Sequence, residues 1–476
     1  MQKPKHKVSR KLPASLKTGF EVRRKVVAAQ KLSPVAQDRE KVRRWIVNLV
    51  FVVYWLLIFE GVLRKWALPS MQKIIFFIRD PFVLTIYFLA FKYRMWPRLS
   101  PIFSVGVGLS ASFLGLALVQ AIVLNISPII VVYGWRNYCF YIPLAFLIGE
   151  HFRGKDLARL VRQTLWMSVP IAVLCYRQFS SPMDDIVNQS YDKGAQAMLV
   201  ARGIVRTSGT FTVSAAQTLY IGTVLSMLTS VWLLAKKQRP LRMAGLLLAT
   251  AAAITMIAVS GARSALVESA VIIMAGVVAT FFIHRERPRW SRLLVLPALL
   301  VVAVVSYLYV FPAAYSAMVD RQLTAQATEG NSWIRVTSTF TSVFGTIPQL
   351  SLLGAGLGAY TNAASMLNTG QMGVGSEDEW SRHVQEAGIF GFAYIAYRIW
   401  LSTWLIRESV RATRRSFNPF PLVLVGFEAV TLLIGQITLQ GTINGYGWLF
   451  AGFCIAANRL ARRRDGGAAT PVDVWK

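Results

Sequence analysis

Acidic residues are scarce in this sequence of 476 residues, which has 22 Asp and Glu against 52 Lys and Arg. Charged residues of both signs make up only 16%, whereas soluble globular domains carry about 25%. Hydrophobic residues supply 54%, and the mean hydropathy is +0.46. The composition therefore excludes an ordinary soluble domain and indicates a protein of the membrane.

Cysteine and histidine, the side chains that most often bind zinc, are also few. The three cysteines, Cys139, Cys175 and Cys454, lie inside apolar runs and are expected to be buried small hydrophobes. The sequence has no disulfide framework and no zinc spacing, and only His383 among the histidines lies away from the basic segments. We therefore expect neither a metal site nor a cofactor.

Apolar runs of about 20 residues, the length that crosses a bilayer as a helix, recur along the chain. They predict an all-α, polytopic membrane protein with about twelve transmembrane helices. The predicted spans are residues 45–59, 74–91, 102–124, 129–149, 157–179, 212–235, 241–259, 265–283, 293–311, 387–406, 420–439 and 442–458.

Basic residues concentrate on one side of this predicted arrangement. If the segment before the first span is cytoplasmic, the cytoplasmic segments contain about 38 of the 52 basic and 9 of the 22 acidic residues. These segments then carry about +29 of the formal net charge of +30. This asymmetry follows the positive-inside rule, so both termini are predicted to be cytoplasmic and nucleic acid is not expected as a partner.

The predicted organisation has three parts. A basic tail of residues 1–44 is expected to be either an anchor attracted to anionic membrane lipid or a disordered arm. A transmembrane domain covers 45–458, and a second basic tail covers 459–476. Two loops on the outer side are long, at about residues 180–211 and 312–386. The second loop is predicted to contain short helices at 314–327 and 333–344, followed by a tight turn at Gly354, Gly356 and Gly358.

Several arginines lie outside the cytoplasmic segments. Arg206 precedes the sixth predicted span and Arg263 lies between the seventh and eighth, so both fall at the outer membrane boundary. Two planar guanidinium groups at one depth can bind a pyrophosphate; the alternative is that each extends to the lipid headgroups. Arg136 lies within the fourth span with no obvious neighbouring acid, whereas Arg79 and Asp80 are expected to pair locally.

The end of the long outer loop combines acidic residues with the isolated histidine. Glu377, Glu379 and His383 are candidates for a general base that deprotonates a hydroxyl nucleophile. On a helix, Glu379 and His383 face the same side, so the carboxylate can orient the imidazole. The alternative is an acidic, solvated helix start, which the helix dipole favours.

Short motifs occur in a fixed order along the chain. They are Arg206-x-x-Gly209-x-Phe211, Ser260-x-x-Arg263-Ser264, Arg335 followed by Pro348 and Leu353-Gly-Ala-Gly-Leu-Gly-Ala-Tyr360, and Glu386-Ala-Gly-Ile-Phe-Gly391. In this order they resemble the superfamily of bacterial O-antigen ligases and O-antigen polymerases, which includes exopolysaccharide polymerases. The segment from Glu60 to Trp66, together with Arg79-Asp80-Pro81, resembles the exopolysaccharide branch.

The resemblance implies a metal-independent glycosyltransferase at the periplasmic face of the inner membrane, and we hypothesise that the transfer is inverting. Its donor is a glycan on polyprenyl pyrophosphate, and its acceptor is a second glycan. The arginines assigned to the pyrophosphate are Arg206, Arg263, Arg335 and Arg136.

The assignment of the base stays open within this resemblance. The family often has a histidine about nine residues before the glutamate of the last motif, and that position is Glu377 here. Either Glu377 or Glu379 serves as the base, or His383 substitutes, or the activity differs. A polymerase is favoured over a ligase with a lipid or protein acceptor, and a lipid or oligosaccharide transporter is the alternative of another class. Other polysaccharide-assembly proteins are further candidate partners.

Overall fold

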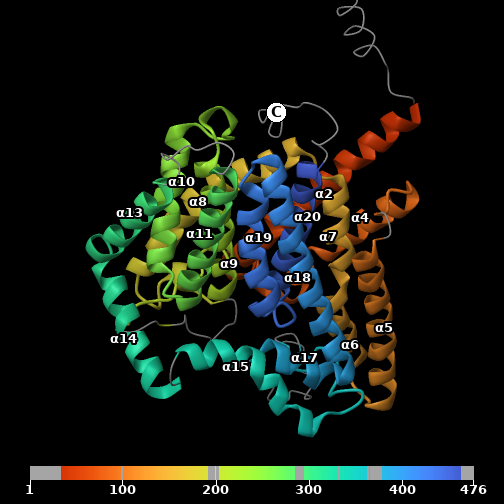
Figure 1. Cartoon of the computed structure of the whole chain (residues 1–476). Helices are drawn as coiled ribbons and strands as arrows, with labels where there is room; N and C mark the ends of the chain where they lie inside the picture. Colours follow the sequence, from red (N-terminus) through yellow and green to blue (C-terminus); the bar gives the residue numbers. More distant parts are fainter. Residues whose placement is uncertain are drawn as a thin grey trace, which may run out of the picture. The chain divides into compact units, whose positions relative to one another are not determined.

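The computed structural model describes residues 34–97, 100–190, 199, 203–284, 294–329, 332–361, 364 and 378–462. Every named element in this part is a helix, and one isolated β-bridge joins Leu199 to Val205 (Figure 1). The chain divides into an N-terminal unit, Met1–Trp45, and a second unit, Ile46–Lys476. Most of both predicted basic tails lies outside the described residues.

The first half of the chain forms helices α2 to α8. Their bounds are α2 Pro34–Val62, η1 Leu63–Ala67, η2 Pro69–Met71, α3 Gln72–Ile75, α4 Asp80–Lys92, α5 Pro101–Val123, α6 Pro128–Trp135, η3 Arg136–Phe140, α7 Ile142–His151 and α8 Gly154–Ser180. The second half begins at η4 Ile186–Asn188. It continues with α9 Ser214–Leu233, η5 Lys236–Gln238, α10 Met243–Val259, α11 Arg263–His284, α13 Val295–Tyr309, α14 Pro312–Glu329, α15 Ser332–Gly345, η6 Ile347–Gln349, α17 Glu379–Ala387, α18 Ile389–Ser416, α19 Phe420–Ile434 and α20 Gly441–Arg462.

The predicted all-helical class is confirmed, and each of the twelve predicted apolar segments contains helix. Five helices among the described residues are long and apolar enough to cross a membrane, or six if the bent pair α13–α14 forms one span. The five are Gln37–Ala67, Pro101–Val123, Ser214–Leu233, Arg263–Ile283 and Ile389–Ser416. The number of twelve crossings stays a prediction.

Two predicted spans are interrupted. The span at 74–91 breaks ahead of α4, where Pro81 occupies the first turn and its missing N–H removes no helical hydrogen bond. The span at 129–149 passes from α6 into the π-helical turn η3, which contains Arg136. Such π-turns are frequent at functional sites, and both breaks carry buried ionic side chains.

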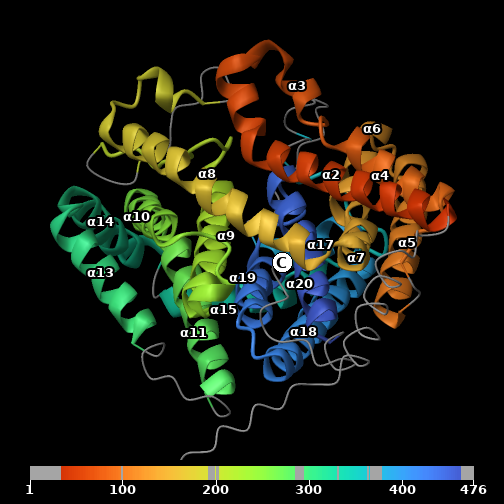
Figure 2. The same ribbon diagram turned by 90° about the horizontal axis from the view of Figure 1, so that it is seen from above.

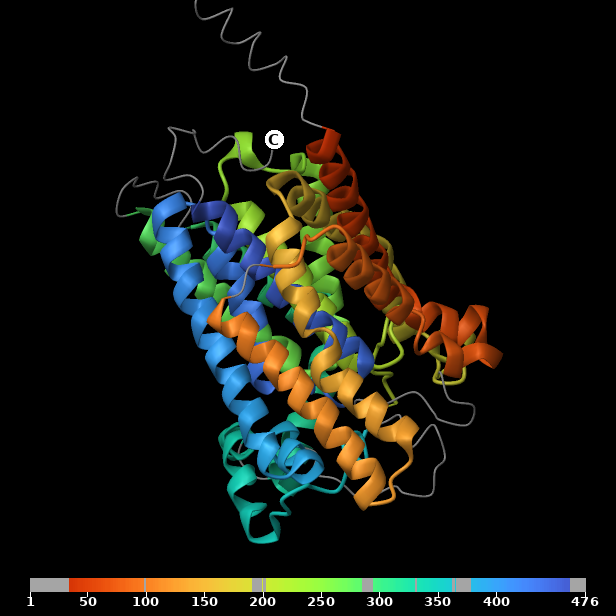
Figure 3. The ribbon, with the colours of Figure 1, turned by 90° about the vertical axis from the view of Figure 1, so that its right-hand side faces the viewer.

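The bundle of the second unit is built from neighbours distant in sequence. α20 packs along α7, and α19 lies between α18, α11 and α9, while α8 packs against α10 (Figure 2). The predicted helices of the long outer loop are confirmed as α14 and α15. α15 and α17 lie across one end of the bundle, where α17 contacts both α15 and α18 (Figures 1 and 3).

The predicted tight turn at Gly354–Gly358 is also confirmed. Gly354, Gly356 and Gly358 have φ values of +74°, +114° and +79°, a region that side chains with a Cβ rarely adopt. The side chain of Gln120 on α5 accepts from Leu357 N at 2.8 Å and donates to Leu353 O at 2.5 Å. Gln120 also donates to Glu386 O at 2.9 Å, and Ala355 N donates to Gln385 O at 2.7 Å, so the turn is held against the end of α17.

Gly354→Ala is expected to lower the free energy of unfolding by about 1–3 kcal/mol, because a Cβ is strained at this φ. The added Cβ would also lie 2.4 Å from Glu386 O and 2.5 Å from Gly388 N. Thermal unfolding in detergent measures the effect. Gly108→Ala is the control, since its Cβ meets nothing within 4 Å and alanine should stabilise α5 by about 0.5–1 kcal/mol. Equal stability of the two variants would contradict the packing of the turn.

Candidate functional site

A buried ionic network surrounds Glu379 at the start of α17. Its Oε1 accepts from Thr438 N at 2.9 Å and from Arg398 Nη1 at 3.1 Å. Its Oε2 is in contact with Arg382. Glu379, Arg382 and Arg398 are each at most 2% exposed, so the carboxylate neutralises charge in the interior. Buried charges require such pairing.

His383 lies one turn further along α17 and is fully buried. Its Nε2 is 2.7 Å from Arg398 Nη1, and its Nδ1 is 3.1 Å from the hydroxyl of Tyr138. Since a guanidinium only donates, Nε2 accepts and the proton is assigned to Nδ1, which donates to Tyr138. Tyr138 in turn donates to Glu386 Oε2 at 2.9 Å. The imidazole therefore links Arg398 to Glu386 through Tyr138.

The electrostatics of α17 agree with this arrangement. Burial and the positive charges of Arg398 and Arg382 hold the pKa of His383 well below its usual value of 6.5. Burial raises the pKa of Glu386, although Arg382 and the hydrogen bond from Tyr138 oppose that change. His383 is accordingly neutral near pH 7.

The free energy of unfolding is expected to fall as the pH drops below about 6.5. In that range the unfolded chain takes up a proton at His383 that the folded chain does not, and this favours unfolding. Above about pH 6.5 both states are neutral at this residue and its contribution is flat. The measurement compares thermal unfolding between about pH 8 and 5.5 in the wild type and in His383→Gln. An identical pH slope in both would show that His383 titrates normally when folded.

The structure thus brings Glu379 and His383 together, with 3.5 Å between Glu379 Oε1 and His383 Nε2. Both side chains are engaged by buried protein groups in this conformation. Glu377, the third candidate base, lies outside the described residues.

A second ionic group connects α2, α4 and η3. Glu60 pairs with Arg64 and Arg79, each at 3.2 Å, and Asp80 pairs with Arg136 at 2.6 Å. The predicted local pair of Arg79 with Asp80 is therefore wrong, because each finds its partner on another segment. Arg136 does have a neighbouring acid, which sequence distance concealed.

The two ionic groups are linked through the interior. Asn137 Nδ2 donates to Thr438 O at 3.0 Å, and Thr438 donates to Glu379 through its backbone and its hydroxyl. Arg79 also donates to Gly441 O at 2.9 Å. Arg136 is consequently part of a continuous buried network.

A third group of arginines lies beyond the ends of α9 and α10. Arg206 precedes α9, Arg263 begins α11, and Arg321 comes from α14; all three are half-buried. Arg321 Nη1 donates to Gly261 O at 2.5 Å, and Arg263 Nη1 donates to Gln322 Oε1 at 3.4 Å. These bonds fasten α14 to the turn between α10 and α11.

Arg206 experiences the combined field of this group. Burial, followed by the positive charges of Arg321 and Arg263, lowers the pKa of Arg206 to about 10. Its Nε is buried and has no hydrogen-bond partner within the described structure. The two arginines predicted to share one depth therefore lie within electrostatic range of each other, together with Arg321, which sequence reasoning missed.

The backbone around Arg206 is fixed by several buried bonds. Gln178 Oε1 accepts from Gly209 N at 2.7 Å, and Lys65 Nζ donates to Ser208 Oγ and to Gly209 O, each at 3.0 Å. A Cβ on Gly61 would lie 2.3 Å from Thr210 O. The motif beginning at Glu60 and the motif beginning at Arg206 are thus packed together, which preorganises the arginine.

Two further acids escaped sequence reasoning, Glu268 on α11 and Glu428 on α19. Glu428 is fully buried and neither carboxyl oxygen has a hydrogen-bond partner among the described residues, and Glu268 Oε1 is also without one. Each is a single acid inside an apolar run, and this pattern could have marked both residues as functional candidates from the sequence alone. Arg335 lies on α15, but its side chain is outside the described part, so its assignment stays a prediction.

These features define a class, a helical membrane protein with a buried ionic network and a cluster of arginines beyond the ends of its bundle helices. Compared with models of known protein families and with curated proteins, the sequence gives no match.

Proposed function

We propose that the chain is a glycosyltransferase of the bacterial inner membrane that polymerises glycan units carried on polyprenyl pyrophosphate. The proposal includes the predicted topology of twelve spans, with both termini in the cytoplasm and the loop that contains α14, α15 and α17 in the periplasm. The acceptor is a second glycan, and neither a metal ion nor another cofactor takes part.

The observation that carries the proposal is the position of Arg206. This guanidinium lies in the positive field of Arg263 and Arg321, and its buried Nε is unsatisfied. Concentrating like charges costs free energy, which an anionic ligand offsets. A pyrophosphate suits the site because its oxygens match several guanidinium forks at once.

The proposed reaction uses the arginines in this position. The acceptor hydroxyl oxygen attacks the anomeric carbon, and the bond from that carbon to the pyrophosphate oxygen breaks with inversion. The bonding electron pair leaves on polyprenyl pyrophosphate, and the hydroxyl proton passes to a base. Preorganised arginines stabilise the charge that develops on the leaving group, usually the largest catalytic contribution of this kind.

The base belongs to the segment around α17, where Glu377, Glu379 and His383 are the candidates. In the described conformation Arg398 occupies the Nε2 lone pair of His383. A role as base for His383 therefore requires Arg398 to move when the substrates bind. Rates of glycan elongation in Glu377→Gln, Glu379→Gln and His383→Ala separate the candidates. Full activity in all three would show that the base does not belong to this segment.

The proposed function is tested by incubating the purified protein in detergent with a polyprenyl-pyrophosphate oligosaccharide, with and without an added lipid or protein acceptor. Elongated glycan should form without nucleotide, added metal or an ion gradient. Elongation of the donor glycan indicates a polymerase, whereas transfer only to an added lipid or protein acceptor indicates a ligase. Absence of any transfer product would contradict both the polymerase and the ligase.

A transporter of lipid or oligosaccharide is the second candidate, and the acids Glu268 and Glu428 favour it. Ionisable residues inside a membrane domain are frequent in proton-coupled pathways. This candidate predicts movement of the lipid-linked glycan in proteoliposomes that depends on a proton gradient, with no change in glycan length. Elongation that continues after the gradient is collapsed would exclude it.

A further inference from the structure

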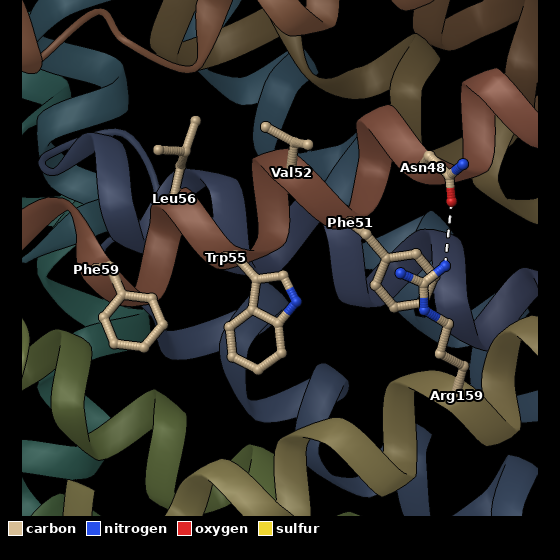
Figure 4. A pocket seen from close by; sticks show the side chains of 7 residues that line it. All are labelled: Asn48, Phe51, Val52, Trp55, Leu56, Phe59 and Arg159. Carbon is tan, nitrogen blue, oxygen red and sulfur yellow. Dashed lines mark hydrogen bonds between the residues drawn. The ribbon is translucent and has the colours of Figure 1, made fainter. Parts of the chain in front are cut away.

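An apolar groove of about 570 Å³ runs along α2 beside α8, on a part of the molecule that the proposed reaction does not use (Figure 4). Six of its lining residues come from consecutive turns of α2, and Arg159 on α8 closes one end. The residues from α2 are Asn48, Phe51, Val52, Trp55, Leu56 and Phe59. Its walls are therefore aromatic and aliphatic, with polar groups at one end only.

Arg159 is fixed at that end by two contacts. Its Nη1 donates to Asn48 Oδ1 at 3.1 Å, and its guanidinium lies 4.3 Å from the centre of the Phe51 ring (Figure 4). No other hydrogen bond of Arg159 occurs within the described structure, so its remaining donors are available to a ligand. Lys155, exposed on the same end of α8, extends the positive charge.

The dimensions of the groove match one leaflet of a bilayer. From Asn48 to Phe59 the helix rises about 16 Å, at about 1.5 Å per residue. Half of the bilayer hydrocarbon core is about 15 Å. A cation at one end, followed by an apolar wall of this depth, fits a lipid with its phosphate at Arg159 and one acyl chain along Trp55 and Phe59.

The groove belongs to the leaflet opposite the arginine cluster. Gln178, which holds the Arg206 loop, follows Arg159 on α8 by nineteen residues, or about 28 Å of helix. That distance is nearly the full hydrocarbon thickness of about 30 Å. The polyprenyl donor, with its pyrophosphate at Arg206, therefore enters from the other leaflet, and a phospholipid is the occupant that fits here.

We propose that the groove between α2 and α8 is a specific binding site for an anionic phospholipid. The phosphate accepts from the guanidinium of Arg159, and the acyl chain covers the aromatic wall of α2. The site goes beyond the proposed glycosyl transfer, and binding of an anionic phospholipid does not require that reaction. The exclusion of the polyprenyl donor as its occupant rests on the proposed function, and the assignment of its leaflet as cytoplasmic rests on the proposed topology.

The test uses the full chain in detergent with photoactivatable phosphatidylglycerol and phosphatidylethanolamine, each carrying the reactive group on its acyl chain. Crosslinked peptides are identified by mass spectrometry. Peptides covering residues 48–59 should be labelled about fivefold more by phosphatidylglycerol, since one basic residue near the surface contributes about 1 kcal/mol toward an anionic lipid. Arg159→Gln should remove this preference, and Arg159→Lys should retain part of it.

Arg162→Gln is the matched control, because Arg162 is exposed on the same helix and does not line the groove. It should keep the preference for phosphatidylglycerol. Leu56→Trp, which fills the groove while leaving Arg159 in place, should reduce labelling by both lipids. Equal labelling by the two lipids in the wild type, or an unchanged preference in Arg159→Gln, would overturn the proposal. Unlabelled polyprenyl phosphate and unlabelled phosphatidylglycerol are also compared as competitors of the labelling. Stronger competition by the polyprenyl phosphate would overturn the proposal as well.

Discussion

Arg206→Ala and Arg263→Ala are each expected to lower the rate of glycan elongation by about 100- to 1,000-fold. This is the usual effect of removing one preorganised group that stabilises charge in a transition state. The Arg206 side chain has no hydrogen-bond partner at Nε, so its loss leaves no buried acceptor unpaired there. Single-turnover elongation with a lipid-linked oligosaccharide measures the effect.

Arg177→Ala provides the comparison for these variants. Arg177 is exposed near the C-terminal end of α8, next to Gln178, which binds the Arg206 loop. Its charge is not among those that shift the pKa of Arg206. It should leave elongation within about twofold of the wild type, as is usual for a surface change away from the site. Arg321→Ala should resemble Arg206→Ala, although α14 also loses its bond to Gly261. Wild-type elongation in Arg206→Ala would end the assignment of this residue to the donor.

Glu379→Gln is expected to lower the free energy of unfolding by about 3–5 kcal/mol. Removing one partner of a buried ion pair leaves uncompensated charge, and here both Arg382 and Arg398 lose their carboxylate. An amide can still accept from Thr438 N, so the loss reports mainly on charge. Thermal and chemical unfolding in detergent give the difference from the wild type.

Glu428→Gln is the matched change at an equally buried acid. Neither of its carboxyl oxygens has a hydrogen-bond partner in the described part of the chain. Replacing such a group leaves no protein hydrogen-bond partner behind, so the change should be neutral or stabilising. A large loss of stability in Glu428→Gln, or none in Glu379→Gln, would contradict the distinction between a paired and an unpaired acid.

The positions of the helices were largely predictable because apolar length is a local property. The segments 314–327 and 333–344 were likewise predicted as helices and are found as α14 and α15. The breaks within the predicted spans at 74–91 and 129–149 were harder to predict from the sequence. Arg79 pairs with Glu60, and Asp80 pairs with Arg136, 56 positions further along the chain. Such pairing depends on how segments pack, which periodicity does not specify.

The candidate site was predictable in part for the same reason. Arg206 and Arg263 were recognisable from the common depth that the ends of the apolar runs predict for them. Arg321 carries no such signal, since it lies on a polar helix whose position over the turn at Gly261 is a tertiary property. The hydrogen bond from Arg398 to Nε2 of His383 could be recognised only from the structure, because Arg398 lies on the next helix in an apolar run.

The most direct test of the account is equilibrium binding of a short-chain, water-soluble polyprenyl pyrophosphate to the purified protein. The corresponding monophosphate and alcohol serve as comparisons, in the wild type and in Arg206→Gln. We predict that the pyrophosphate binds most tightly, that the alcohol binds weakest, and that Arg206→Gln weakens pyrophosphate binding about tenfold or more, in line with the loss of a charge-assisted hydrogen bond. Equal affinity for all three compounds, or unchanged pyrophosphate binding in Arg206→Gln, would contradict a diphosphate site at these arginines.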